Sequence, residues 1–120
     1  MKLFESGEDY LERILVLKEK NEHVRSIDIV NDMGFSKPSV SVAMKKLKEN
    51  GFIEIDKNGY ITLTDSGYQI ANRIYERHQL LTQLFVSLGV DEETAMKDAC
   101  KIEHDLSDET FQAIKNRIKK

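Results

Sequence analysis

Apolar residues recur three and four positions apart over most of the chain, which is the spacing of amphipathic helices. In the second of the predicted helices we expect Ile27, Val30 and Met33 to face the core. Glycines follow several of these segments, and a glycine with a left-handed backbone commonly ends a helix. The predicted helices cover residues 1–21, 26–33, 36–50, 65–88 and 91–105, and a last one runs from residue 107 onward.

A short turn containing Gly34 separates the second and third predicted helices, as in a helix-turn-helix pair. Two short apolar runs follow, residues 52–55 and 60–63. The turn between them contains Asn58-Gly59, a dipeptide that favours a tight β-hairpin. A hairpin placed directly after a helix-turn-helix pair is typical of the wing of a winged-helix DNA-binding domain.

The predicted elements divide the chain most clearly near residue 64. We predict a mostly α fold with a small β-hairpin. Residues 1–64 would form an N-terminal winged helix-turn-helix domain, and residues 65–120 a C-terminal helical domain. The helix over residues 65–88 would connect the two.

Local charge supports a DNA-binding role for the third predicted helix. Residues 36–48 contain four lysines and no acidic residue. An ordinary three-helix core with a solvated lysine face is the competing interpretation. The residues that we expect to contact bases or phosphates are Ser36, Lys37, Pro38, Ser39, Ser41, Val42, Lys45, Lys46, Lys57 and Asn58.

Composition narrows the class of protein further. With 18 basic and 21 acidic residues the formal net charge is −3, which excludes a chain that coats nucleic acid by bulk positive charge. Hydrophobic residues make up 40%, too many for a disordered chain, and a single cysteine excludes an internal disulfide framework. No apolar run approaches the roughly 20 residues that span a bilayer. We expect a soluble cytoplasmic protein that does not contact membranes.

The second half of the chain contains metal-ligand residue types at close spacing. Cys100, Glu103 and His104 are three and four positions apart, so they would share one helix face about 100° wide. Each residue alone has an ordinary explanation, such as a core cysteine or a solvated acidic face, and spacing alone leaves a joint site undecided. The remaining candidate ligands lie on other predicted helices: Asp9, Glu12 and His78.

Three other functions share parts of this pattern. A metal-independent winged-helix regulator that senses a small organic ligand would use the C-terminal helical domain only for dimerisation. A small metalloenzyme or thiol enzyme would use Cys100 and His104 as nucleophile and base. No glycine-rich anion loop, HExxH motif or nucleophile elbow accompanies these residues, so we predict that the chain is not an enzyme. A winged-helix protein that binds only other proteins would have the same N-terminal domain.

The sequence resembles the diphtheria-toxin-repressor family of metal-dependent transcriptional regulators, and its layout is most similar to the manganese transport regulator branch. The resemblance implies a homodimer that binds a palindromic operator when loaded with Fe²⁺ or Mn²⁺, with Co²⁺, Ni²⁺ or Zn²⁺ as surrogates, and that represses metal-uptake genes. The segments that carry it are residues 8–12, 36–41, 63–67, 77–81 and 99–107, in order and at family spacing.

The resemblance also implies a ligand set for the metal. Asp9 matches the manganese branch, whereas Cys100 matches the iron branch, so the donors are mixed. A carboxylate suits Mn²⁺, and a thiolate favours softer or later metals. The implied primary metal ligands are Asp9, Glu12, His78, Cys100, Glu103 and His104.

Overall fold

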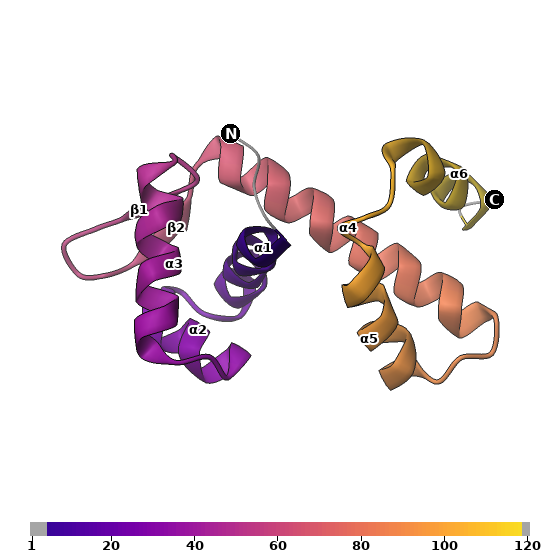
Figure 1. Ribbon diagram of the computed structural model, residues 1–120, viewed down its shortest axis with the longest axis horizontal. Coiled ribbons are helices and arrows are strands. Elements are labelled where there is room, and N and C mark those ends of the chain that lie inside the picture. The colour runs from indigo at the N-terminus through magenta and orange to yellow at the C-terminus, as the bar shows by residue number, and fades with distance from the viewer. Residues whose placement is uncertain (1–4, 119–120) are drawn as a thin grey trace. The chain divides into compact units, whose positions relative to one another are not determined.

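The computed structural model describes residues 5–118, which contain six helices and one two-stranded antiparallel sheet (Figure 1). The chain forms two compact units, residues 1–72 and 73–120. The predicted order of helices and strands is confirmed, as is the mostly α fold class. The elements are α1 (Glu5–Lys20), α2 (Ser26–Met33), α3 (Lys37–Glu49), β1 (Ile53–Ile55), β2 (Ile61–Leu63), α4 (Asp65–Ser87), α5 (Glu92–Ile102) and α6 (Asp108–Ile118).

The first unit packs three helices and the hairpin around one apolar core. One expectation was wrong: Ile27 is 41% exposed, and Ile29 is fully buried in its place. Ile29 and Met33 are four residues apart and share a helix face, whereas Ile27 lies on a different side. The largest fully or nearly fully buried side chains described in this unit are Leu11, Ile14, Val24, Ile29, Val40, Met44, Ile53 and Ile61.

The hairpin turn lies where the sequence predicts it, although Gly59 has a positive φ and Asn58 does not, so it is not the primed turn that an Asn-Gly pair favours. Strands β1 and β2 pair with Ile53 opposite Leu63 and Ile55 opposite Ile61. The Asp56 carboxylate accepts hydrogen bonds from the backbone N–H groups of Asn58 and Tyr60, at 2.8 and 3.0 Å. Gly59 has a φ of 81°, a backbone angle that residues with a side chain rarely adopt.

A close backbone contact fixes the start of α4 beside the hairpin. The Thr64 hydroxyl donates to the carbonyl oxygen of Gly51 at 2.7 Å and accepts from the N–H of Gly67 at 3.2 Å. A Cβ atom on Gly67 would lie 2.0 Å from the carbonyl oxygen of Phe52. Only glycine fits this position without a backbone shift.

The second unit consists of the later turns of α4 together with α5 and α6. Helix α5 ends at Ile102, three residues before the predicted end, and Glu103 forms its C-cap. Its start follows the prediction, because the Asp91 carboxylate caps the N–H of Glu93 at 3.2 Å. None of the described helices combines the length and apolar character needed to cross a membrane, although α4 has 23 residues.

Candidate metal centre and nucleic-acid interface

Three of the predicted ligands meet within the second unit. His78 comes from α4, Cys100 from α5, and Glu103 from the C-cap of α5. The Nδ1 atom of His78 lies 3.1 Å from Oε2 of Glu103 and 3.6 Å from Sγ of Cys100. One donor atom from each of the three residues falls within 4.8 Å of the other two. This sulfur, nitrogen and oxygen set suits a divalent transition metal ion.

Glu103 has an unusual environment for a carboxylate. Its side chain is fully buried, and Oε1 has no hydrogen-bond partner. The Nε2 atom of His104 lies 3.6 Å from that oxygen, beyond hydrogen-bond distance. Burial of an unsatisfied carboxylate oxygen is costly, and an ion bound there would remove the cost. The geometry of Glu103 therefore fits the metal that the donor set suggests.

The same contacts change the protonation of His78. The hydrogen bond to Cys100 raises the pKa of His78 most, and the hydrogen bond to Glu103 raises it next most. Together they bring the pKa to about 10, although burial of the ring opposes the shift. At neutral pH the imidazole is therefore protonated. Because Nδ1 faces both partners, its proton occupies the side of the ring on which a metal ion would bind.

Arg77 is a buried residue beside the candidate site whose positioning role sequence reasoning missed. It is 4% exposed, and its guanidinium donates to the backbone carbonyls of Glu103 and Leu106, at 3.0 and 2.6 Å, and to the carboxylate of Asp108. It also lies over the Phe111 ring, 5.2 Å from the centroid. These hydrogen bonds fix the turn that follows α5, and they thereby fix the backbone of Glu103, a candidate metal ligand. Only its place beside His78 could have suggested this role, because a helical arginine ordinarily indicates a solvated face.

The other predicted ligands lie as follows. His104 is in the turn after α5, directly beyond Glu103, and its side chain is 3% exposed. Asp9 and Glu12 lie three residues apart on α1 in the first unit, the former half-buried and the latter buried. The predicted donors are therefore divided between the two units, two in the first and four in the second.

The predicted DNA-contacting surface is accessible. Ser36 caps α3, accepting a hydrogen bond from the N–H of Ser39 at 3.3 Å, and Pro38 lies in the first turn. Val42 is 55% exposed, an accessible apolar side chain of the kind that contacts a thymine methyl group. Every predicted contact residue is exposed: Ser36, Lys37, Pro38, Ser39, Ser41, Val42, Lys45, Lys46, Lys57 and Asn58.

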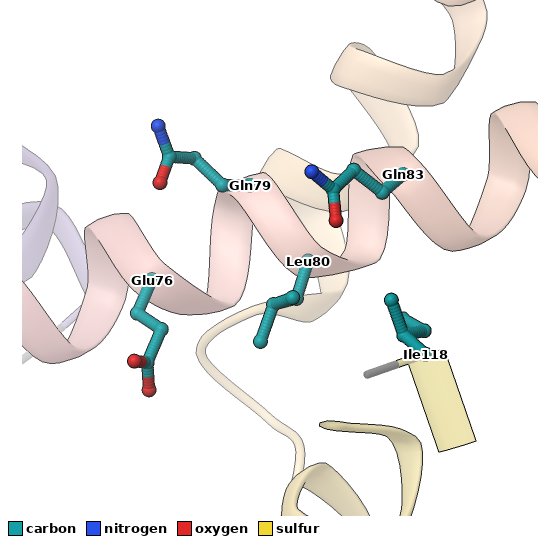
Figure 2. A pocket seen from close by; sticks show the side chains of 5 residues that line it. All are labelled: Glu76, Gln79, Leu80, Gln83 and Ile118. Atoms are coloured by element: carbon teal, nitrogen blue, oxygen red, sulfur yellow. The ribbon is translucent and has the colours of Figure 1, made fainter. Parts of the chain in front are cut away.

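A pocket of about 370 Å³ in the second unit lacks the donors of a metal centre (Figure 2). Glu76 supplies its carboxylate, and that group pairs with Lys115 at 3.2 Å. Neither histidine nor cysteine lines it. The lining residues are Glu76, Gln79, Leu80 and Gln83 from α4 and Ile118 from α6.

Comparison with known proteins identifies the family. Residues 2–61 match the N-terminal DNA-binding domain of iron-dependent repressors, and residues 64–120 match their metal-binding and dimerisation domain. The chain belongs to this family of metal-dependent transcriptional repressors. The predicted family and class of function are thereby confirmed.

Individual relatives agree with this assignment. An uncharacterised HTH-type transcriptional regulator of Methanocaldococcus jannaschii is 37% identical over 113 residues, covering 92% of this chain and 90% of that protein. The regulator MntR of Bacillus subtilis is 36% identical over 102 residues, covering 85% of this chain and 72% of that protein.

Solved structures give the same fold. A manganese-dependent transcriptional repressor in complex with manganese has a TM-score of 0.84 at 30% identity, covering 92% of this chain and 51% of that one. The manganese regulator SloR has a TM-score of 0.82 at 29% identity, covering 94% and 53%. The chain thus spans about half the length of these two proteins.

Proposed function

We propose that this protein is a cytoplasmic homodimer that binds palindromic operator DNA when it is loaded with Mn²⁺ or Fe²⁺, and that it represses metal-uptake genes. Residues 1–64 bind the DNA, and residues 65–120 bind metal and dimerise. The observation that carries the proposal is the buried Glu103 carboxylate, with one oxygen on His78 and the other without a hydrogen-bond donor.

The proposed ligand set combines donors from both halves of the chain. Without a cation, Asp9, Glu12 and Glu103 repel one another in any arrangement that brings them together. When bound, a divalent cation offsets the repulsion between these carboxylates. The state that binds DNA is then the one in which all donors converge. The proposed ligands are Asp9, Glu12, His78, Cys100, Glu103 and His104.

The exposed face of α3 supplies the DNA contacts. Short side chains at its N-terminus, with Val42, enter the major groove and contact base edges. Lys45, Lys46 and Lys57 contact phosphates, which position the protein without reading sequence. A homodimer places two such helices about 34 Å apart along the DNA, or at a multiple of that distance, and this explains the expected palindrome.

Fluorescence anisotropy tests the proposal. Labelled DNA from upstream of the protein's own gene is titrated with protein in Mn²⁺, in anaerobic Fe²⁺ and in EDTA. We expect tight binding only with metal, and we expect Glu103→Gln to lose the metal response. Glu109→Gln is the matched control, because Glu109 is exposed on α6. Retention of the full metal response by the Glu103 variant would disprove the site.

Binding that is indifferent to EDTA would favour a regulator that responds to an organic ligand. The pocket in Figure 2 is where such a ligand would be sought, since about 370 Å³ is within the size range of small-molecule sites. Its side chains offer amide and carboxylate groups for hydrogen bonding.

A further inference from the structure

The loop between α1 and α2 runs alongside the wing. The N–H of Ile61 in β2 donates to the carbonyl oxygen of Val24 at 2.7 Å, and Val24 is fully buried. Arg25 has extended backbone angles, φ −121° and ψ 165°. In an extended segment alternate side chains face opposite sides. His23 and Arg25 therefore project away from the buried side of Val24.

Both projecting side chains contact the ring of Tyr60. The His23 and Tyr60 rings stack, with centroids 4.0 Å apart and planes 2° from parallel. The guanidinium carbon of Arg25 lies 4.7 Å from the Tyr60 centroid, within the range of a cation–π contact. The backbone N–H and carbonyl of Tyr60 are both hydrogen-bonded to Asp56. These bonds hold the Tyr60 backbone in place at the end of the turn between β1 and β2, which is the wing.

The position of this stack suits a contact with the DNA backbone. Arg25 is exposed and directly precedes α2, the first helix of the helix-turn-helix pair. In such pairs the first helix crosses the phosphate backbone. A guanidinium presents a planar fork of donors that matches phosphate oxygens, and stacking on an aromatic ring restricts its rotation.

We propose that Arg25 contacts a DNA phosphate at the base of the wing, and that Tyr60 and His23 are positioning residues that hold its guanidinium. The contact rests on the proposed function and adds a cation that sequence reasoning did not include. It is independent of base sequence. Its loss weakens binding to operator and unrelated DNA alike.

The salt dependence of binding by the metal-loaded full chain tests the proposal. Each lost phosphate contact reduces the slope of log K against log[salt] by about 0.9, so Arg25→Gln should reduce it by about 1.8 for a dimer. Arg25→Lys should keep the slope. Lys97→Gln, which removes one exposed positive charge from α5, should also leave it unchanged.

Variants of the ring test the positioning role. Tyr60→Phe keeps the stacking surface and should bind as the wild type does, whereas Tyr60→Leu should weaken binding and lower the slope. Circular dichroism checks that each variant is folded. An unchanged slope for Arg25→Gln, with or without a loss of affinity, would overturn this inference alone. If metal-loaded wild-type protein bound no DNA, the proposed function and this inference would both be overturned.

Discussion

Metal binding should compete with a proton on His78. The pKa of this imidazole is raised to about 10 by its hydrogen bonds to Cys100 and Glu103, so it is protonated at neutral pH. Binding through Nδ1 requires the neutral ring. Between pH 7 and pH 9 the metal affinity should therefore rise at least about tenfold for each pH unit, which is about 1.4 kcal/mol per unit for each proton displaced. At pH 7, three units below the pKa, this competition costs about 4 kcal/mol.

Isothermal titration calorimetry measures the effect. Mn²⁺ is titrated into the full chain in two buffers with different ionisation enthalpies, which gives the number of protons released. We expect at least one proton per site at pH 7 and one fewer for His78→Gln. His23→Gln is the matched control, because His23 is an exposed histidine of the first unit. Affinity that is equal at pH 7 and pH 8, with no proton release, would refute the reasoning.

The metal-free protein should respond to pH in the opposite direction. A histidine whose folded pKa lies above its unfolded value of about 6.5 contributes stability that is fully present below pH 6.5. That contribution is lost as the pH rises through about 10. The melting temperature of the apo protein should therefore fall between pH 7 and pH 10, while that of the metal-loaded protein falls less.

Three substitutions test other parts of the structure. Gly67→Ala should destabilise the protein by about 1–3 kcal/mol in thermal unfolding, because a Cβ atom would lie 2.0 Å from the Phe52 carbonyl oxygen. The control Ser66→Ala should change the stability little. Equal stability of the two variants would contradict this contact. Arg77→Lys should cost about 2 kcal/mol and weaken metal binding, measured by denaturant unfolding and calorimetry, because an ammonium cannot span the acceptors that the guanidinium joins. Cys100→Glu should raise the affinity for Mn²⁺ relative to Zn²⁺, measured by competition with a chelating dye, and an unchanged ratio would show that the thiolate does not bind the metal.

Much of the fold could be predicted because local signals agree with one another. The Asn58-Gly59 turn and the Ser36 cap act through short-range backbone chemistry, and they lie where the sequence indicates. The orientation of α2 could not be predicted, because a helix of eight residues with apolar side chains on several sides has no unique inward face. Packing against the rest of the core selects Ile29 over Ile27.

The site was predictable in part. Helical periodicity alone brings Cys100 and Glu103 to one side of α5. Their approach to His78 depends on how α4 and α5 pack, which spacing does not determine. The backbone of Glu103 is held further by Arg77, 26 residues earlier in the chain, which donates to its carbonyl oxygen. Such long-range contacts leave no local signal in a single sequence.

The arrangement of donors also indicates which of them can make DNA binding depend on metal. A ligand shifts an equilibrium between two states only by its difference in affinity for them. His78, Cys100 and Glu103 lie together within one unit, so a metal ion held by these three alone would have the same affinity whatever the other unit does. Under the proposed function these three residues provide affinity, while Asp9 and Glu12 on α1 provide the coupling. Asp9→Ala should therefore weaken Mn²⁺ binding in calorimetry only modestly but remove most of the metal dependence in DNA anisotropy, a typical coupling being about 5- to 150-fold. The His78→Ala variant should weaken both Mn²⁺ binding and the metal dependence of DNA binding. Equal losses of both properties in the Asp9 variant would contradict this separation of roles.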